Sequence, residues 1–239
     1  MKKLSGETKL LLIMGLIVLL GGGFLALAPK NIEDPLVPGQ TPAPAAPPPA
    51  PSRAEFDRLL GEPGVAVKGD AKADLAVIEF GDVECSSCRY AYDKFGKKFG
   101  KGISVQLSFR HFPLDMHPFG KPCAIALEAA GKQGKFWELY DALFTDLSAV
   151  LSEDFIREKA KRVGLDMAKF ETDRRSPDAI QRVEADFKLG GEMKVTHTPT
   201  FFVLNRKDGK IQVAVGPREF IQLFQGVPGI PTPEPGKPH

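Results

Sequence analysis

Hydrophobic and polar residues follow four different patterns along the chain. Residues 10–28 carry no charge, residues 29–52 are rich in proline and alanine, residues 53–225 alternate between apolar and polar positions, and residues 226–239 are again rich in proline. We interpret residues 53–225 as the folded domain, because apolar periodicity is what a hydrophobic core requires. The pattern predicts an extended linker before this domain and a disordered tail after it.

The uncharged segment predicts a membrane anchor at the N-terminus. Its nineteen residues follow three lysines among the first nine residues, and a helix that spans a bilayer needs about 20 apolar residues. The lysines are expected to stay in the cytoplasm, so that residues 29–239 lie outside a cytoplasmic membrane crossed once. A signal peptide cleaved after the Ala-Leu-Ala sequence of residues 26–28 is the alternative.

Several short runs in the folded part predict strands. Residues 75–80 are almost wholly apolar, which is typical of a central strand that is buried on both faces. Residues 103–109, 200–205 and 210–215 predict three more strands, and the Asp208-Gly209 pair between the last two predicts a hairpin turn.

Helical periodicity alternates with these strands, which predicts an α/β fold. It covers residues 122–193 and 218–224, and another helix is expected to start at Cys85. On that helix one buried face is predicted from residues at the spacing i, i+4, i+7 and i+11: Cys88, Tyr92, Phe95 and Phe99.

Composition and charge narrow the function. The 239 residues carry a net charge of +2, the difference between 32 basic and 30 acidic residues, and basic residues occur only in short groups. A nucleic-acid partner is therefore not expected. The chain has three cysteines, too few for a disulfide-stabilised scaffold, so the fold must depend on packing.

Two of the cysteines form the motif Cys85-Ser86-Ser87-Cys88. At the start of a helix this spacing brings two sulfurs within bonding distance, and the positive helix end lowers the pKa of the first thiol. The motif therefore predicts thiol-disulfide exchange, with Cys85 as the attacking thiol and Cys88 as the buried, resolving one. Half of a structural zinc site is the alternative, although no second motif supplies the other ligands. No metal and no cofactor besides the cysteine pair are expected.

A second feature lies where residues 195–199, Val-Thr-His-Thr-Pro, lead into the apolar run 200–205. A proline at the entry of a strand is either an ordinary edge proline or part of a cis turn. His197 either adds a positive charge close to the cysteines or is an ordinary surface residue.

Three segments carry a family resemblance. They are residues 77–88, which run from Val-Ile-Glu-Phe to the cysteine pair, residues 131–138 (Gly-Lys-Gln-Gly-Lys-Phe-Trp-Glu) and residues 198–202 (Thr-Pro-Thr-Phe-Phe). Together they resemble the DsbA-like disulfide oxidoreductases of the thioredoxin superfamily over about residues 62–225.

The resemblance implies a thioredoxin fold with a helical insertion at about residues 113–194. It also implies a cis Pro199 beside the cysteines and a Thr198 whose backbone pairs with the substrate chain. Glu79 corresponds to a buried acid that assists proton transfer at the inner thiol. The alternative for Glu79 is a solvated position, because an ionised carboxylate in an apolar strand is costly without a partner.

Ser86 and Ser87 depart from the family pattern, in which proline and then histidine or an aromatic residue often stand between the cysteines. Both serines are expected to lie against the substrate. Without a neighbouring imidazolium, the helix end and the serine hydroxyls are expected to stabilise the Cys85 thiolate, which predicts an oxidant weaker than the strongest members.

The remaining cysteine and two histidines have simpler interpretations. Cys123 lies on an alanine-rich helical pattern and is expected to be a small core residue; a second redox thiol is the alternative. His111 and His117 flank residues 113–115 and are interpreted as parts of a strand-to-helix connection rather than as metal ligands.

Three classes of function fit the sequence. In the favoured one the protein is an enzyme that oxidises secreted or periplasmic proteins and is itself reoxidised by a membrane partner. The second is a reductase or isomerase on the same fold. Dimeric isomerases of the superfamily usually have an added N-terminal dimerisation domain, and the proline-rich linker does not resemble one. The third class is a metal-binding thiol module, which would not need the Thr198-Pro199 loop.

Overall fold

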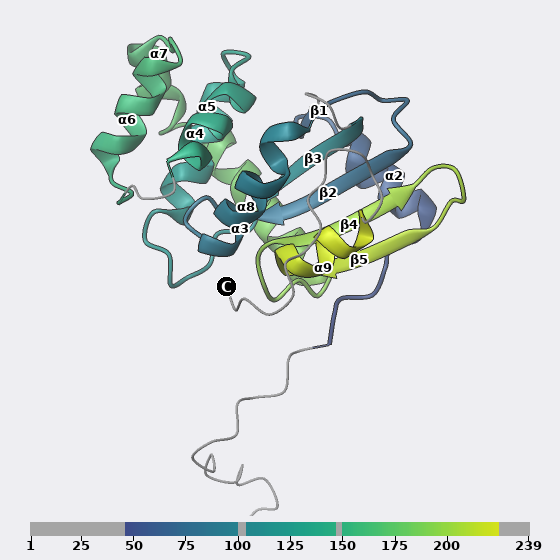
Figure 1. Cartoon of the computed structure of the whole chain (residues 1–239). Helices are drawn as coiled ribbons and strands as arrows, with labels where there is room; N and C mark the ends of the chain where they lie inside the picture. Colours follow the sequence, from purple (N-terminus) through teal and green to yellow (C-terminus); the bar gives the residue numbers. More distant parts are fainter. Residues whose placement is uncertain (1–45, 100–103, 147–149, 225–239) are drawn as a thin grey trace, which may run out of the picture. The chain divides into compact units, whose positions relative to one another are not determined.

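Strands and helices alternate along the folded part of the chain. The computed structural model describes residues 46–99, 104–146 and 150–224. Its strands are β1 (Ala66–Lys68), β2 (Leu75–Gly81), β3 (Val105–His111), β4 (Thr200–Asn205) and β5 (Ile211–Val215). They form one sheet in the order β1-β3-β2-β4-β5, in which β2 and β3 run parallel and the other neighbours run antiparallel (Figure 1).

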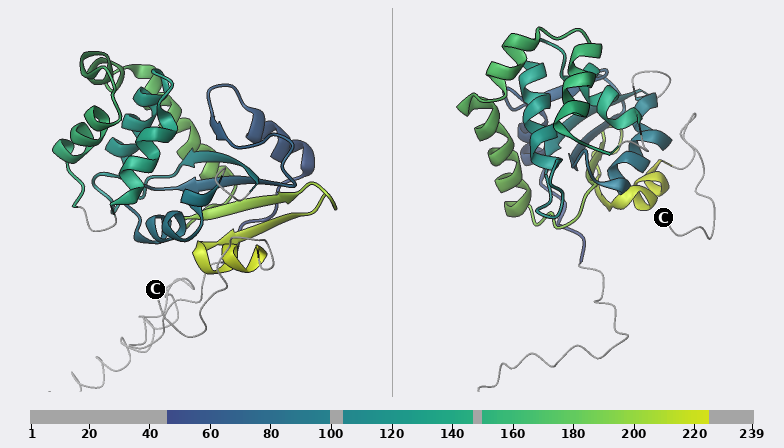
Figure 2. Two further views of the ribbon diagram at one scale, coloured as in Figure 1. Left: turned by 45° about the horizontal axis from the view of Figure 1, so that its top comes forward. Right: turned by 90° about the vertical axis from the view of Figure 1, so that its left-hand side faces the viewer.

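Helices surround this sheet and fill the stretch of chain between β3 and β4. In chain order they are α2 (Arg53–Gly61), α3 (Ser86–Lys94), the 3-10 helix η2 (Gly96–Lys98), α4 (Gly120–Gly131), α5 (Phe136–Thr145), α6 (Glu153–Arg162), α7 (Met167–Asp173), α8 (Pro177–Glu192) and α9 (Gly216–Leu223). The helices α4 to α7 gather at one end of the sheet (Figures 1 and 2). Together with α8 they are the helical insertion, which agrees with the expected α/β architecture.

The expected membrane anchor and tail cannot be compared with this architecture. Residues 1–45 and 225–239 lie outside the described residues, and residues 46–52 have no regular secondary structure. Within the described ranges, no helix combines the length and the apolar character that crossing a membrane requires.

Alternation along β2 gives the sheet two buried faces. Val77 packs with residues of α3 and α9, whereas Ile78 and Phe80 pack with α2 and with the end of α8. Each of these three side chains is completely buried, and burying a side chain of this kind contributes about 1.5–3 kcal/mol to stability. The central position of β2 therefore fixes the position of the segment that follows its last residue, Gly81.

The insertion has its own core, which depends on the apolar stripe of α5. Phe136, Leu139, Tyr140 and Leu143 are buried at helical spacing and pack with residues of α4, α6 and α7. Cys85, Cys88 and Phe109 belong to the same cluster. The insertion thus shares its core with the C-terminal ends of β2 and β3.

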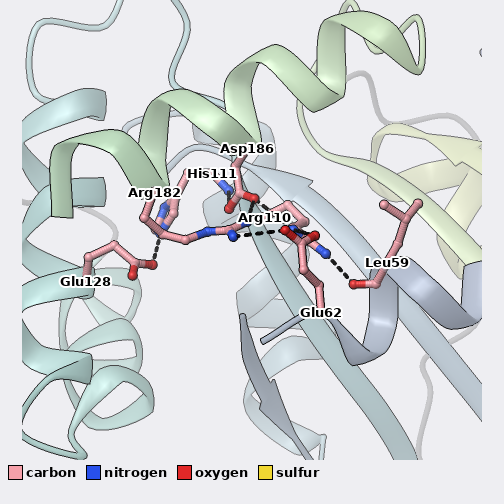
Figure 3. Close-up of polar contacts among 7 residues, drawn as sticks. All are labelled: Leu59, Glu62, Arg110, His111, Glu128, Arg182 and Asp186. Carbon is pink, nitrogen blue, oxygen red and sulfur yellow. Dashed lines mark hydrogen bonds and ion pairs between the residues drawn. The ribbon is translucent and has the colours of Figure 1, made fainter. Parts of the chain in front are cut away.

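A cluster of four charged residues, of which Arg110 and Asp186 are buried, joins the sheet to the helices on one face (Figure 3). Arg110 of β3 is completely buried, and its Nη1 atom lies 2.9 Å from both Asp186 Oδ1 on α8 and Glu62 Oε2 after α2. Its Nη2 atom donates a hydrogen bond to the Leu59 carbonyl, and Arg182 pairs with both carboxylates. We refer to Arg110, Asp186, Glu62 and Arg182 as the Arg110 cluster.

The helix that follows the cysteines is shorter than its apolar stripe predicts. It ends at Lys94, and Phe95 leaves the helical conformation with φ of −141° before η2. Glycine at position 96 disfavours continuation of the helix. Consequently Tyr92 packs in the core of the insertion, whereas Phe95 stacks on Phe220 of α9 at 4.5 Å between ring centroids. The expected face, which runs from Cys88 to Phe99, is buried but is not one helical face.

The other boundaries differ from the predicted ones by at most two residues, and the strand predicted at residues 200–205 is β4 itself. The strand expected at residues 103–109 is β3, Val105–His111, because it pairs with the whole of β2 from Leu75 to Gly81. The last helix starts at Gly216 rather than at residue 218, since Pro217 suits a first helical turn.

Candidate active site

The cysteine pair lies at the C-terminal end of β2. Cys85 is the N-cap of α3 and Cys88 lies in its first turn. Because β2 pairs antiparallel with β4, with Phe80 opposite Thr200, the end of β2 lies beside the loop that enters β4. This pairing brings Thr198 into contact with Cys85 across 113 residues of sequence.

Cys85 is arranged to exist as a thiolate. The hydrogen bond from the Cys88 thiol, then the Thr198 hydroxyl and the backbone N–H groups of Cys88 and Ser87, lower the pKa of Cys85 from 9.0 to about 6 against the opposing effect of burial. As a thiol, Cys85 instead donates to the Thr198 carbonyl at 3.3 Å. In that state the Thr198 hydroxyl has no hydrogen-bond partner. Ionisation of Cys85 supplies one.

Cys88 has the opposite electrostatic character. It is completely buried, and burial, followed by the hydrogen bond to Cys85 and the negative charges of Cys85 and Glu79, raises its pKa well above 9.0. The backbone N–H of Asp82 donates to its sulfur at 3.5 Å and partly opposes this rise. The two thiols therefore differ as the helix geometry predicts, although Cys85 is itself only 7% exposed.

Glu79 occupies the centre of β2 and is 5% exposed. Burial raises its pKa from 4.5 to about 8, and the positive charge of Lys68 and a hydrogen bond with Tyr140 only partly offset that effect. The carboxyl group is thus mainly protonated at neutral pH. The alternative that Glu79 is a solvated edge residue is wrong.

The loop before β4 has the conformation that the resemblance implies. The Thr198-Pro199 peptide is cis. Both residues are buried, and the Pro199 carbonyl accepts a hydrogen bond from Gly216 N at 2.7 Å. The Thr198 carbonyl thereby faces the Cys85 sulfur.

The other expected site residues contribute less directly. Ser86 is exposed and Ser87 is half-buried. The hydroxyl that lowers the pKa of Cys85 belongs to Thr198, whereas Ser87 acts through its backbone N–H, contrary to the expected role of the serine hydroxyls. His197 is exposed, and its Nδ1 lies 2.9 Å from the Thr196 hydroxyl.

Cys123 and the two histidines of the connection take separate positions. Cys123 is completely buried on α4, as expected of a core residue, and burial raises its pKa to about 12. His111 Nε2 lies 2.8 Å from Glu128 Oε1, whereas His117 Nδ1 lies 2.6 Å from Asp82 Oδ2. Each imidazole is thus paired with a different carboxylate.

Asp82 and Tyr140 are site residues that the sequence interpretation missed. Asp82 follows the last residue of β2 and contacts both cysteines through its backbone, since its carbonyl accepts from Cys85 N at 3.2 Å and its N–H donates to Cys88. The sequence feature that could have identified Asp82 is its position as an acidic residue between a buried strand and the cysteine motif. Tyr140 lies 61 positions after Glu79 in the numbered sequence, and no local pattern links the two.

Solved structures are similar to this chain in fold. A thioredoxin-like oxidoreductase from Silicibacter pomeroyi DSS-3 is 26% identical with a TM-score of 0.59, covering 70% of this chain and 92% of that one. BdbD from Bacillus subtilis is 25% identical with a TM-score of 0.52, covering 62% and 84%. The thiol-disulfide exchange protein alpha-DsbA2 from Wolbachia pipientis, 16% identical with a TM-score of 0.60 over 71% and 89%, shares the fold.

The fold and the cysteine pair together define a thioredoxin-like protein whose cysteine motif suits thiol-disulfide exchange. A family model described as thioredoxin matches residues 62–220. The chain belongs to the thioredoxin family, and the expected thioredoxin-like α/β fold is confirmed.

Matching curated proteins are named as transporters. A Na⁺/H⁺ antiporter NhaA from Salinispora tropica is 34% identical over 142 residues, and one from Herminiimonas arsenicoxydans is 37% identical over 144 residues. Each match covers 59% of this chain but only 22% of the antiporter. This chain therefore spans about a fifth of those relatives, and the transport activity in their names is not carried over to it.

Proposed function

We propose that this protein introduces disulfide bonds into client proteins outside the cytoplasm. In the first step a client thiolate attacks Cys85 Sγ, the Cys85–Cys88 bond breaks, and Cys88 leaves as a thiolate. In the second step another client thiolate attacks the client sulfur of the mixed disulfide and expels Cys85 as a thiolate. The client gains one disulfide and the enzyme is left with two reduced cysteines.

The observation that carries this proposal is the stabilised Cys85 thiolate. Its pKa of about 6 means that reduced Cys85 is mainly ionised at neutral pH. Stabilising the thiolate stabilises the reduced pair, which makes the corresponding disulfide a stronger oxidant and Cys85 a better leaving group. The oxidase direction is favoured over the reductase or isomerase direction for this reason.

Glu79 supplies the proton that the first step requires. Cys88 leaves as a thiolate in a completely buried position where its pKa is high, so it must be protonated before the client is released. The nearby Glu79 carboxyl, with a pKa of about 8, carries a proton at neutral pH. Acid and base exchange this proton most readily when the pKa of the carrier is close to the working pH.

Client binding is proposed for the surface around the cis proline. The Thr198 backbone borders Cys85, and a client chain that pairs with this loop has its cysteine next to the Cys85 sulfur. Exposed Ser86 and His197 flank this position. The enzyme needs a redox partner that reoxidises the pair, and we propose that this partner is a membrane protein.

The location rests on the N-terminal sequence. Residues 10–28 carry no charge and follow three lysines, which favours one membrane crossing with the catalytic domain on the periplasmic or extracellular side. An oxidising compartment also suits an enzyme whose working form is a disulfide.

The reduction potential of the Cys85–Cys88 pair tests the direction of exchange. We expect a value less negative than about −200 mV, since a thioredoxin-like reductant has a potential of about −270 mV. Equilibration of the purified full chain with glutathione buffers measures it. A potential as negative as that of thioredoxin would favour the reductase.

The redox state of the cysteine pair in cells is a second test of the direction of exchange. We expect the pair to be mainly oxidised, and the reduced fraction to be modified in intact cells by a thiol reagent that does not cross membranes. A pair that is mainly reduced, or that reacts only after lysis, contradicts the oxidase or its location.

A further inference from the structure

We infer that His117, acting through the Asp82 carboxylate, positions the backbone N–H that stabilises the Cys88 thiolate. This inference rests on the thiol-disulfide exchange proposed above and concerns the Cys88 thiolate, which leaves in the first step and attacks Cys85 Sγ when that step runs in reverse. Asp82 and His117 touch no substrate. They are positioning residues that belong to different parts of the chain, one at the end of β2 and one in the connection to α4.

Asp82 is joined to the cysteines through its backbone alone. Its carbonyl accepts from Cys85 N at 3.2 Å, and its N–H donates to Cys88 Sγ at 3.5 Å. A backbone donor stabilises a thiolate only while it points at the sulfur, because hydrogen bonds weaken steeply when the donor turns away. Whatever fixes the orientation of Asp82 therefore affects the reactivity of Cys88.

The side chain of Asp82 is fixed by three donors. Its Oδ1 accepts from Glu84 N at 2.8 Å, and its Oδ2 accepts from Leu114 N at 2.9 Å and from His117 Nδ1 at 2.6 Å. A carboxylate can only accept, so the His117 Nδ1 atom must carry a proton in this contact. The Asp82 carboxylate is completely buried, whereas the His117 side chain is 20% exposed.

The start of α4 leaves space for the Asp82 carboxylate. A Cβ atom on Gly120, the first residue of α4, would lie 2.8 Å from Asp82 Oδ1 and 3.0 Å from Oδ2, so no larger residue fits without displacement. One residue earlier, the N–H of Phe119 donates to Glu84 Oε2. The connection from Leu114 to Gly120 thus wraps around the turn that leads from β2 to Cys85.

Loss of the His117 donor would leave the buried Asp82 carboxylate with backbone donors only. A buried carboxylate that loses a charge-assisted hydrogen bond turns toward another donor or toward water. Such a turn rotates the Asp82 backbone away from Cys88. The attack by Cys85 does not use the Asp82 N–H and should be spared.

A small aromatic disulfide, 5,5′-dithiobis(2-nitrobenzoate), separates the two steps in the reduced full chain. The Cys85 thiolate first attacks the reagent, forms a mixed disulfide and releases one coloured thiolate. Cys88 then loses its proton, attacks Cys85 Sγ, forms the Cys85–Cys88 disulfide and releases the second coloured thiolate. The two releases appear as successive absorbance phases.

We expect His117→Leu to slow the second phase about tenfold while the first changes by less than about twofold, the size that one charge-assisted hydrogen bond implies. His117→Asn should restore the second phase, because the asparagine amide nitrogen occupies nearly the position of Nδ1 and donates to Asp82. The matched control is Asp115→Asn, which removes a charge from an exposed residue of the same connection and should leave both phases unchanged.

Stability is measured in parallel, by thermal unfolding, for each variant. If His117→Leu does not fold, His117→Gln replaces it, since its amide nitrogen lies too far along the side chain to imitate Nδ1. A second phase that is unaffected in these variants overturns the inference. So does equal slowing of both phases, or a His117→Asn variant as slow as His117→Leu.

The reagent is not a client protein, which keeps this test apart from the proposed function. A parent protein that shows both phases when reduced, but whose oxidised form yields no mixed disulfide with reduced clients, refutes the proposed function only.

Discussion

Asp186 and Glu79 are both buried carboxyl groups next to the same central strands, but their surroundings differ. Asp186 is 2% exposed and accepts from Arg110 and from His111 N, with Arg182 paired to it as well (Figure 3). Glu79 is 5% exposed, and the charge of Lys68 and the hydroxyl of Tyr140 do not offset the cost of burial. Pairing makes the first group a structural anchor, and the lack of full pairing suits the second to the role of proton carrier that we propose for it.

Breaking the paired region should have the largest effect on stability. Asp186→Ala leaves Arg110 buried without its closest partner on α8, and removal of one member of a buried ion pair costs about 3–5 kcal/mol. We expect this loss in the free energy of unfolding, measured by urea denaturation. Thiol exchange per folded molecule should remain near the parent value.

The control lies on the same helix. Glu184 pairs with Lys121 at 3.0 Å, but both side chains are more than half exposed, so Glu184→Ala should change stability by less than about 0.5 kcal/mol. Equal losses for the two variants would contradict the role given to the Arg110 cluster.

Replacing the incompletely paired Glu79 carboxyl should stabilise the protein at high pH while slowing exchange. The folded-state pKa of Glu79 is raised to about 8 from 4.5, so its protonation contributes stability that is fully present below pH 4.5 and is lost as the pH rises through 8. Glu79→Gln removes that dependence. The free energy of unfolding of the variant should exceed that of the parent by several kcal/mol at pH 9, with protonation of Cys88 slowed at least about tenfold.

Unfolding curves from pH 5 to pH 9 measure the first effect, and the pH profile of exchange measures the second. Glu138→Gln, an exposed change on α5, should alter neither. A Glu79→Gln variant with the parent's pH dependence would show that Glu79 carries no proton in this range.

The sequence predicts the exchange site well because most of its signals are local. The apolar run that becomes β2, the cysteine spacing at the start of α3 and the proline before β4 each act within a few residues. The Arg110 cluster is different, since Arg110 and Asp186 are 76 positions apart. A charged residue within an apolar strand indicates that it has a partner of opposite charge. Only the folded structure shows which residue that partner is.

The shortened α3 teaches the same lesson on a smaller scale. Periodicity placed Tyr92 and Phe95 on one helical face, whereas α3 ends between them at Lys94 and the two residues pack in different cores. The spacing of apolar residues predicts that they are buried. It does not predict which element they pack against.

The smallest expected effect concerns a buried thiol without a redox partner. Cys123 is completely buried, like Cys88, but it is not part of a motif with a second cysteine three residues away. Cys123→Ala should reduce the free energy of unfolding by about 1 kcal/mol, as is typical of a small core truncation. The rate of disulfide exchange should not change. A loss of exchange in this variant would make Cys123 a third redox thiol.

Trapping of mixed disulfides tests most directly whether Cys85 attacks and Cys88 resolves. Cys88→Ala keeps the ionised thiol and removes the resolving one. When this variant is mixed with client proteins that already carry a disulfide, Cys85 attacks that disulfide, one client sulfur leaves as a thiolate, and the adduct should accumulate, whereas Cys85→Ala should trap almost none. Mass spectrometry of the adducts identifies the linked cysteine. Adducts on Cys85 in the first variant alone are the predicted result, and adducts on Cys88 or Cys123 would contradict the account.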